Sequence, residues 1–559
     1  MKVYEAVAAG LAAEGCDTLF GLMGDGNMSL WGALGRAGKI AIISSGNEAG
    51  AVSMADGYSR ATGKVGVATI TCGPGLTQVG TSLTIAVRHR SQLVLVIGQI
   101  PAGAKNRLQS MDQRRFVEAC GARFHDISGV DDLADEMAEA FYAARVHRCP
   151  VVLNLDMNLQ ERSFDRDFEY RPSSTYLPAR AGVPSEDALI PVLEKLVKAE
   201  RPVIIAGRGA QVAGARAEIV KLAEQVGALL ATTLQSKGWF AGEEYDIGIC
   251  GAFAAAPSEQ LLAQADFVLG IGAELGYYTT EGGLIFPSAE VARIDIEAAP
   301  EEIGFLPGLY VCGDAKKTAA ALCQKLQARG MRKAGFRTAE TRAVLQAPEH
   351  VFAKPTDGLD PRLLARNLSA ALPKGCVVTS GAGHFLAFPA MYLTLPEGAE
   401  IRFSYHFGAV GQGLPLAIGI GVGNPGRPHI AIEGDGSLLM NVQELFTVAR
   451  HKLQLVLIVW NDAGFGAEVH KLRAKGFDSS LAQWQSPDYA ALARGFGGDG
   501  VTLKSEAELG AAIERGLKAG GLFVIDARVS PSTMADSYAK VHFDEANRAP
   551  LLRRLARSA

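Results

Sequence analysis

Two acidic residues in the C-terminal third of the chain each follow an apolar run and stand beside glycines. Asp435 lies in the tetrapeptide Gly-Asp-Gly-Ser at 434–437, and Asp462 comes 27 residues later in an Asn-Asp-Ala-Gly sequence ending at Gly464. Glycines let backbone N–H groups approach a phosphate closely, and carboxylate oxygens suit Mg²⁺. The spacing therefore predicts a metal-bridged diphosphate, with Asp435, Asp462 and the Gly464 carbonyl on the metal and Gly434, Gly436 and Ser437 around the phosphates.

These residues need a strand–helix–strand unit to bring them together. The apolar runs at 429–432 and 455–460 are typical of short buried strands, and a segment of helical character separates them. Similar runs ending in glycine recur along the chain and alternate with segments of helical spacing such as 133–146 and 211–226. This alternation predicts an α/β protein with parallel sheets, whose ligands bind where the strands end.

The apolar runs fall into three groups of similar size. Prolines between 172 and 184 mark the first boundary, and a charged stretch followed by 347–361 marks the second. We expect domains at 1–170, 185–335 and 355–530 and a tail at 531–559. The end of the tail, 548–559, mixes arginines with leucines, and we expect it to pack on the protein or be solvated rather than to bind a membrane.

Composition excludes several classes of protein. Lys and Arg number 55 and Asp and Glu 59, so the net charge of −4 offers no basic field for nucleic acid. No apolar run approaches the ~18 residues of a membrane helix, and the N-terminus lacks the layout of a signal peptide. The eight cysteines stand singly, without a Cys-x-x-Cys pair, which suits a reducing compartment and predicts a cytoplasmic protein.

The Gly-Asp-Gly motif, with the Asn-Asp pair at this spacing, resembles the signature of the thiamine-diphosphate-dependent enzymes. The resemblance covers nearly the whole chain and implies three doubly wound α/β domains, which in chain order bind the cofactor's pyrimidine, form a central unit and bind its diphosphate. It also implies thiamine diphosphate and Mg²⁺ as cofactors. The family usually has Asn where this chain has Asp462, which keeps an oxygen ligand and adds negative charge.

A second motif resembles the N-terminal domain of the same family. The segment 44–75, SSGNEAGAVSMADGYSRATGKVGVATITCGPG, places Glu48 where the family has the glutamate that hydrogen-bonds N1′ of the pyrimidine. Such a carboxylate stabilises the imino tautomer and makes the 4′-nitrogen the internal base. In the family this glutamate and the metal site belong to different subunits of one active site. The resemblance thus implies at least a homodimer, and commonly a homotetramer.

Two further segments resemble parts of the family's cofactor site. The segment 406–419, HFGAVGQGLPLAIG, places Val410 as the apolar wedge beneath the cofactor and the Gly408 carbonyl as the acceptor from its 4′-amine. The segment 380–385, SGAGHF, resembles the one that reaches the diphosphate from the other side and contains Gly383 and His384. His384 has two interpretations, a phosphate contact or a structural hydrogen bond.

The closest branch of the family is that of the acetolactate synthases and 2-oxo-acid decarboxylases. Asp25, in FGLMGDGNMSL, and Glu468, in NDAGFGAEVHK, stand where decarboxylases of this branch have catalytic acids. Gln109, in AKNRLQSMDQRR, fits the acetolactate synthase pattern instead. Phe465, between glycines, is expected to be a pocket wall or a packing residue. Asp25 could also cap a helix, and Glu468 could be a surface charge.

The branch implies decarboxylation of a 2-oxo acid, followed by release of an aldehyde or ligation to a second carbonyl compound. A benzaldehyde-lyase-like cleavage of 2-hydroxy ketones, a nicotinamide-dependent dehydrogenase and a non-catalytic homologue are the alternatives. The segment 381–388 lacks the third glycine of a dinucleotide motif, and the retained Glu48 argues against a non-catalytic homologue. Acetolactate synthases bind FAD around segments like 201–211 and 270–278, but here GAELGYY replaces their usual stretch of acidic and arginine residues, which disfavours FAD.

Overall fold

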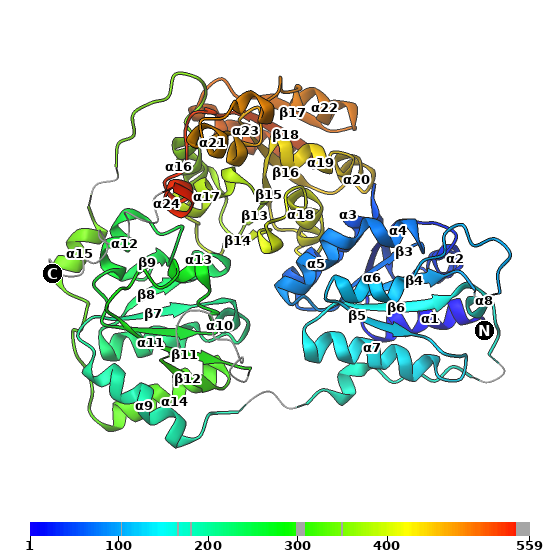
Figure 1. Ribbon diagram of the computed structural model, residues 1–559, viewed down its shortest axis with the longest axis horizontal. Helices are drawn as coiled ribbons and strands as arrows, with labels where there is room; N and C mark the ends of the chain where they lie inside the picture. Colours follow the sequence, from blue (N-terminus) through cyan, green and yellow to red (C-terminus); the bar gives the residue numbers. More distant parts are fainter. Residues whose placement is uncertain (102, 165–166, 179–181, 298–307, 348–349, 544–559) are drawn as a thin grey trace.

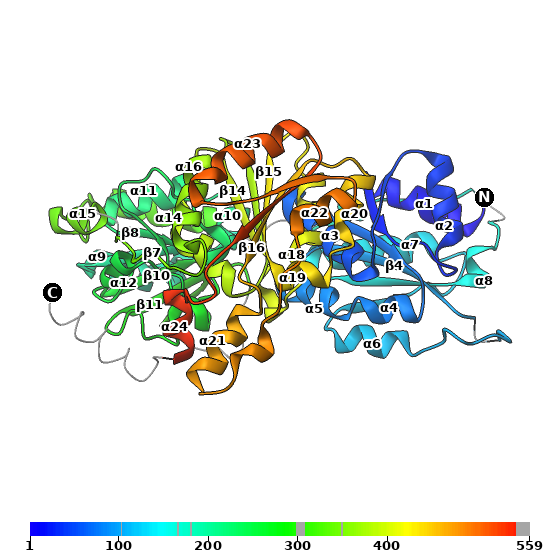
Figure 2. The same cartoon turned by 90° about the horizontal axis from the view of Figure 1, so that it is seen from above.

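The computed structural model describes residues 1–101, 103–164, 167–178, 182–297, 308–347 and 350–543. The C-terminal segment 548–559, for which packing or solvation was expected, lies outside these residues. In the described part the strands form three six-stranded sheets, all parallel, with helices on both faces (Figures 1 and 2). The prediction of an α/β protein with three doubly wound domains is confirmed.

The first sheet has the strand order β2-β1-β3-β4-β6-β5. Its strands are β1 (Thr18–Gly21), β2 (Ala41–Ser44), β3 (Gly66–Ile70), β4 (Leu93–Gln99), β5 (Arg123–Asp126) and β6 (Val151–Asp156). Its helices are α1 (Val3–Ala13), α2 (Met28–Ala37), α3 (Glu48–Thr62), α4 (Pro74–Gln78), α5 (Gly80–His89), α6 (Gln113–Ala119), α7 (Leu133–His147) and α8 (Met157–Gln160).

The central sheet has the order β12-β11-β10-β7-β8-β9. Its strands are β7 (Pro202–Ala206), β8 (Leu229–Thr232), β9 (Asp246–Ile249), β10 (Phe267–Ile271), β11 (Glu290–Asp295) and β12 (Leu309–Cys312). Its helices are α9 (Glu186–Lys198), α10 (Arg208–Val212), α11 (Arg216–Val226), α12 (Ala256–Leu262), α13 (Tyr277–Thr280), α14 (Ala315–Ala328) and α15 (Ala339–Leu345). The helix expected over 211–226 is interrupted at Gly214, whose φ of +64° ends α10 before α11 begins.

The third sheet has the order β14-β13-β15-β16-β18-β17. Its strands are β13 (Val377–Ser380), β14 (Glu400–Phe403), β15 (His429–Gly434), β16 (Leu455–Asn461), β17 (Asp499–Thr502) and β18 (Leu522–Arg528). Its helices are α16 (Pro361–Ala371), α17 (Ala387–Tyr392), α18 (Gly413–Val422), α19 (Asp435–Met440), α20 (Glu444–Arg450), α21 (Gly466–Ala474), α22 (Tyr489–Gly495), α23 (Leu509–Ala519) and the final α24 (Asp536–Phe543).

The first and third sheets share one topology, because their strands follow the same order when numbered within each domain. Helices α3 and α18 occupy equivalent places, each between the second and third strands, and they pack against each other between the two domains (Figure 1). Small residues allow this close approach. A Cβ on Gly57 would lie 2.2 Å from the Leu416 carbonyl oxygen, and one on Gly419 would lie 1.9 Å from the Met54 carbonyl oxygen.

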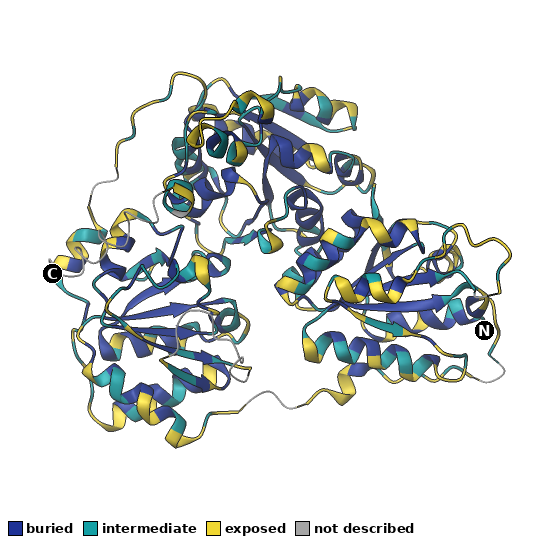
Figure 3. Cartoon of the chain, viewed as in Figure 1, coloured by how far each residue is buried: buried dark blue, intermediate teal, exposed yellow. Residues whose placement is uncertain are grey.

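The cores lie between each sheet and its helices, and the strands are the most buried elements (Figure 3). One apolar cluster runs continuously from α3 through α18 to β16, and so joins the first and third domains. No helix among the described residues is long and apolar enough to cross a membrane. All eight cysteines lie in the described ranges and are free thiols.

Candidate active site

The carboxyl ends of β13, β15 and β16 meet at one edge of the third sheet. The strand order reverses between β13 and β15, and open α/β sheets bind ligands at such a point. Gly434 of β15 pairs in register with Trp460 of β16. Because Asp435 directly follows Gly434 and Asp462 follows Trp460 by two residues, this register brings the two acidic residues to the same edge.

Asp435 and Asp462 form a closely spaced carboxyl pair. Asp435 is 1% exposed, and its Oδ1 has no hydrogen-bond partner among the described residues, while Ser486 Oγ donates to Oδ2 at 3.4 Å. Burial raises the pKa of Asp435 to about 6. Burial and then the charge of Asp435 raise the pKa of Asp462 well above its usual range. Two such carboxylates repel each other unless a cation lies between them, so the pair fits Mg²⁺.

A third protein ligand would have to be a backbone or amide oxygen. Among the described residues, no three His, Cys, Asp or Glu side chains are grouped so that they could hold a metal. Gly464 lies in an antiparallel bridge with Gln483, and next to it the Trp484 N–H donates to the Ala463 carbonyl at 3.0 Å. Mg²⁺ commonly takes one or two carboxylates and completes its shell with phosphate and water oxygens. Two carboxylates and a fixed turn at Gly464 suit that pattern.

Aromatic rings pack against the glycines at the junction of β15 and α19. A Cβ on Gly434 would lie 2.7 Å from the Phe385 ring, and one on Gly436 would lie 2.7 Å from Phe465 and 2.9 Å from Trp484. Phe465 and Trp484 pack edge to face with ring centroids 5.0 Å apart. Only glycine fits at these two positions, which leaves the backbone N–H groups of the turn open to a close ligand. Phe465 thus both walls the site and packs against the turn.

The turn carrying Gly408 and Val410 is tied to α19. Gly408 has a φ of +64°, and the preceding Phe407 also has a positive φ, +67°. The Gly411 N–H donates to Ser437 Oγ at 3.0 Å, and Asn441 Nδ2 donates to the Gly411 carbonyl at 2.5 Å. Ser437, expected beside the phosphates, therefore holds the neighbouring turn with its hydroxyl.

His384 follows Gly383 after β13 and is buried. The Ala535 N–H donates to its Nε2 at 3.0 Å. This nitrogen therefore makes a structural hydrogen bond, as one of the two interpretations of His384 expected. The ring also lines the cavity described next. Burial, and then His470, lower the pKa of His384 to about 3, so the ring is neutral.

One cavity of about 1070 Å³ collects the expected third-domain residues. It is lined by Gly383, His384, Gly408, Val410, Gly434, Asp435, Gly436, Ser437, Asp462, Gly464, Phe465 and Glu468. Glu468 lies in the first turn of α21, with its side chain exposed. The structure therefore brings these twelve residues together around the acidic pair.

The cavity continues into the central domain, where both segments considered for FAD contribute to it. Residues 207–209 follow β7 and residues 272–274 follow β10, and the strand order of the central sheet reverses between these two strands. Tyr277 and Tyr278 also line this part. The position is one where open α/β sheets bind ligands, and the expectation against FAD still rests on the sequence of 270–278.

Asp25, Glu48 and Gln109 lie together at the equivalent edge of the first sheet. Glu48 is the first residue of α3, and a Cβ on Gly75 would lie 3.2 Å from its Oε1. Gln109 Oε1 accepts from Cys72 Sγ at 3.3 Å. Burial first, and also the charge of Asp25, raise the pKa of Cys72, which places Asp25 in the same group.

Asp25 itself is exposed and does not cap a helix. Helix α2 begins at Met28 and its N-cap is Asn27, so the capping interpretation of Asp25 is wrong. Asp25, Glu48 and Gln109 are all absent from the lining of the cavity in the same chain, to which the first domain contributes Arg88, Arg90 and Arg148. The expected site residues thus form two separate groups within one chain.

The third domain nevertheless holds the loop that carries Glu48. Glu444, at the start of α20, accepts from the Gly46 N–H with both carboxylate oxygens, at 3.2 and 3.1 Å, and from Thr447 Oγ1 at 2.6 Å. A Cβ on Gly50 would lie 2.3 Å from Glu444 Oε1. Glu444 therefore fixes the entry into α3 in the same chain that carries Asp435.

Sequence reasoning missed Glu433, Glu444, Trp484 and Ser486. Glu433 is fully buried on β15, and a Cβ on Gly381 or Gly413 would lie 2.3 or 2.0 Å from its carboxylate. Burial raises the pKa of Glu433 to about 7. A charge inside an apolar strand run was a visible signal for Glu433. Trp484 and Ser486 lie in an irregular segment whose sequence has no fixed spacing to the motif.

Comparison with known proteins gives three family matches in chain order. Residues 1–117 match the N-terminal binding domain of thiamine pyrophosphate enzymes, 189–322 their central domain and 381–527 their C-terminal binding domain. Together these ranges cover more than two thirds of the chain.

Curated relatives match along almost their whole length. A probable 2-ketoarginine decarboxylase of Pseudomonas aeruginosa is 29% identical over 91% of this chain and 90% of its own. The acetolactate synthase isozyme 2 large subunit of Escherichia coli is 29% identical over 93% of this chain and 94% of its own. A sulfoacetaldehyde acetyltransferase of Castellaniella defragrans is 27% identical over 93% of this chain and 91% of its own.

The three domain matches follow the same order as the three sheets, and the paired acids and the glycine turn of the signature lie together at the end of β15. The chain therefore belongs to the thiamine pyrophosphate enzymes, in the branch of the acetolactate synthases and 2-oxo-acid decarboxylases, and is a thiamine-diphosphate-dependent lyase or transferase.

Proposed function

We propose that the protein decarboxylates a 2-oxo acid and then either releases an aldehyde or joins the remaining fragment to a second carbonyl compound. The observation that carries this proposal is the Asp435–Asp462 pair beside the glycine turn, in a chain that retains Glu48 at the start of α3. Relatives named as a decarboxylase and as acetolactate synthases support both outcomes. Thiamine diphosphate, when bound, supplies the electron sink for carbon–carbon bond cleavage.

In this proposal each group of residues has one task. Asp435, Asp462 and the Gly464 carbonyl hold Mg²⁺, and the turn 434–436 offers its N–H groups to the diphosphate. Val410 and the Gly408 carbonyl support the pyrimidine, and Glu48 holds a proton at its N1′ atom. Glu468, Asp25 and Gln109 face the reacting carbons, where a carboxyl group can donate the proton that releases an aldehyde.

We further propose that two chains complete each site, as a homodimer or as a homotetramer built from such dimers. The separation of Glu48 from the cavity of its own chain supports this. Leu108 beside Gln109 is 89% exposed, and Met440 at the end of α19 and Phe446 of α20 are each 51% exposed. Apolar side chains of this kind around two half-sites suit burial against a partner. The eight free thiols suit the proposed cytoplasmic location.

A product screen tests the reaction. Purified protein with thiamine diphosphate and Mg²⁺ is given pyruvate, longer, aromatic and guanidino-bearing 2-oxo acids, or 2-hydroxy ketones, each with and without an acceptor aldehyde. We expect CO₂ from at least one 2-oxo acid, dependent on both cofactors. Cleavage of 2-hydroxy ketones with no CO₂ from any acid would establish the aldehyde-lyase alternative instead.

Replacing Glu48 tests the catalytic assignment. In Glu48→Gln we expect cofactor affinity within a few-fold of wild type but exchange of the cofactor's C2 proton slower by 10²–10⁴-fold, because the amide no longer supports the imino tautomer. Exchange is followed by NMR in deuterated buffer, with the exposed surface variant Glu397→Gln as control. Wild-type exchange no faster than that of free cofactor would mean that the protein is a non-catalytic homologue.

Chelation tests the metal assignment. EDTA should release the cofactor from wild-type protein, and adding Mg²⁺ should restore binding. Asp435→Ala should bind no cofactor in either condition, because one ligand is lost and Asp462 alone is left beside the phosphates. Binding is measured by isothermal titration calorimetry, and cofactor retention by Asp435→Ala in the presence of EDTA would refute the assignment.

A further inference from the structure

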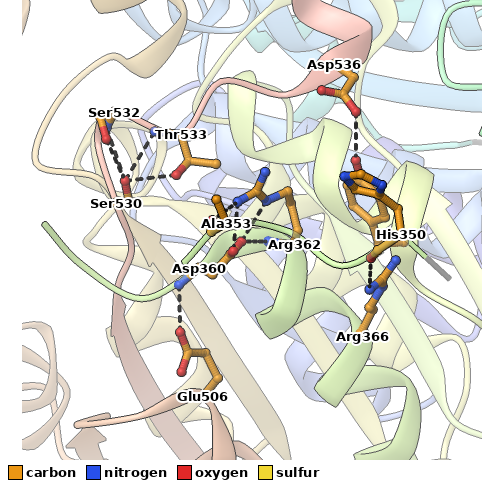
Figure 4. A network of polar contacts seen from close by, with 11 residues as sticks. His350, Ala353, Asp360, Arg362, Arg366, Glu506, Ser530, Ser532, Thr533 and Asp536 are labelled. Carbon is orange, nitrogen blue, oxygen red and sulfur yellow. Dashed lines mark hydrogen bonds and ion pairs between the residues drawn. The ribbon is translucent and has the colours of Figure 1, made fainter. Parts of the chain in front are cut away.

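The segment 535–543 lies along the cavity and is bonded to both domains that line it. The Tyr538 hydroxyl donates to the Ala467 carbonyl at 3.3 Å, and Lys540 forms an ion pair with Glu259 of α12 in the central domain. Asp536 accepts from the Tyr392 hydroxyl at 3.2 Å. Earlier in the sequence, the hydroxyls of Ser532 and Thr533 bond that of Ser530 in a turn (Figure 4). The segment is therefore fixed at several points around the site.

Its contact with His384 determines where that ring carries its proton. The Ala535 N–H donates to His384 Nε2 at 3.0 Å, so Nε2 is an acceptor and carries no hydrogen. The ring is neutral, since burial and His470 lower its pKa to about 3. A neutral imidazole has a single N–H, and it must therefore be on Nδ1.

The Nδ1 atom faces the acidic pair. A Cβ placed on Gly466 would lie 3.2 Å from His384 Nδ1 and 2.2 Å from Asp462 Oδ2, so both atoms border the same small space. Among the described residues Nδ1 makes no hydrogen bond. The ring is held by aromatic neighbours, with centroids 4.7 Å from His470, 5.2 Å from Tyr538 and 5.3 Å from Phe388. A single donor is thus held in one direction, beside the proposed diphosphate site.

We propose that the main-chain N–H of Ala535 sets the tautomer of His384, and that His384 Nδ1–H consequently donates a hydrogen bond to the cofactor's diphosphate. The C-terminal segment is then a positioning element of the cofactor site, acting through one backbone amide. This inference rests on the proposed function, because it takes thiamine diphosphate as the ligand. It assigns a role to a part of the chain that contributes no residue of the signature.

Two proline variants test it. Ala535→Pro removes the donating N–H, whereas Met534→Pro places the same ring one residue earlier, at an N–H that makes no hydrogen bond within the described residues. We expect Ala535→Pro to raise the Kd for thiamine diphosphate about tenfold, the size of one hydrogen bond to a charged group, and Met534→Pro to change it less than twofold. Binding is measured by quenching of tryptophan fluorescence, since Trp484 packs on the glycine turn.

A double-mutant cycle separates the tautomer from general loosening of the segment. In His384→Asn the side-chain amide places a donor near the Nδ1 position, and this donor does not depend on Ala535. We therefore expect Ala535→Pro to add less than a twofold loss of affinity in the His384→Asn background. An equal loss in both backgrounds, or no loss in either, would overturn the inference. Wild-type protein that binds no thiamine diphosphate would instead refute the proposed function, so the two failures are distinguishable.

Discussion

In the proposed metal site, the acidic pair lowers the stability of the folded protein when no cation is bound. Asp435 has a pKa of about 6 against an ordinary 3.8, so the folded state holds its proton more tightly than the unfolded chain does. An acid with a raised pKa makes folding less favourable as the pH rises from about 4 to above 6. At 1.36 kcal/mol per unit this amounts to about 3 kcal/mol at pH 7. A bound divalent cation would recover this energy.

Asp462→Asn makes the cost of the pair measurable, because it removes the carboxyl group whose pKa burial and then the charge of Asp435 raise. We expect the cation-free variant to be more stable than wild type at pH 7, by about 1–2 kcal/mol and a few degrees in Tm, with little difference at pH 4 where the pair is protonated. Differential scanning calorimetry across pH checks this, with exposed Asp187→Asn as control. A lower Tm for Asp462→Asn at pH 7 without cation would contradict the repulsion.

At the scale of single residues, the sequence allowed prediction of the candidate site residues that follow a strand at a fixed spacing. Asp435, Asp462 and Gly464 could be found because parallel strands in register bring the residues after each strand to one edge. Ser486 could not, because an irregular loop brings it to Asp435, and loops follow no period. The hydrogen bond from the Ala535 N–H to His384 spans 151 positions and uses a backbone amide. Every residue except proline has such an amide, so the residue type at 535 could not predict this bond.

Among the elements, helix α3 is the one whose position is constrained by the largest number of contacts described above. Glu48 starts it, Glu444 holds its entry, and its glycine-bearing face lies against α18 so closely that added side-chain atoms have no room. The strand positions that build the site were predictable from apolar runs ending in glycine, and β15 and β16 extend the expected runs by only one or two residues. The contact between α3 and α18 was not, because a glycine-rich helix face shows no apolar stripe.

Gly57→Ala tests this helix contact. The new Cβ would lie 2.2 Å from the Leu416 carbonyl oxygen, and overpacking of this kind costs about 1–3 kcal/mol. We expect lower resistance to urea and weaker cofactor binding, because both half-sites are carried by elements at this contact. Gly35→Ala is the matched control. It lies in the interior of α2 with nothing within 4 Å, and should be neutral or slightly stabilising. If Gly57→Ala and Gly35→Ala had equal free energies of unfolding, the close contact between α3 and α18 would not contribute to stability.

At the scale of the whole molecule, the proposed function assigns the two groups of site residues to two chains. In that proposal the first domain of one protomer faces the third domain of another, so that Glu48 and Asp435 serve one reaction centre. The lining of the cavity supports this arrangement, because the first-domain acids are not part of it. The number of chains in the assembly depends on the surfaces beside each group of site residues. The pattern of residues along one chain does not predict it.

Subunit mixing checks this arrangement directly. Glu48→Gln and Asp435→Ala proteins should each be inactive alone. After joint unfolding and refolding, mixed dimers should hold one site with both native residues and one with both substitutions. We expect activity up to about a quarter of wild type for random equal mixing, since half of the dimers are mixed and each has one intact site. No recovery, with mixed dimers demonstrated by native mass spectrometry, would place both residues in one chain's site.

The shared strand order of the outer sheets bears on how the chain arose. Two domains of equal topology, packed through equivalent helices, would result if a gene for a self-associating module were duplicated and the copies fused. In such a history one copy would have kept the glycine turn beside Asp435, and the other would have kept Glu48 at a helix start. Such a history would give the two copies different tasks in one site. It predicts that the first and third domains still bind each other when the chain is cut on either side of the central domain.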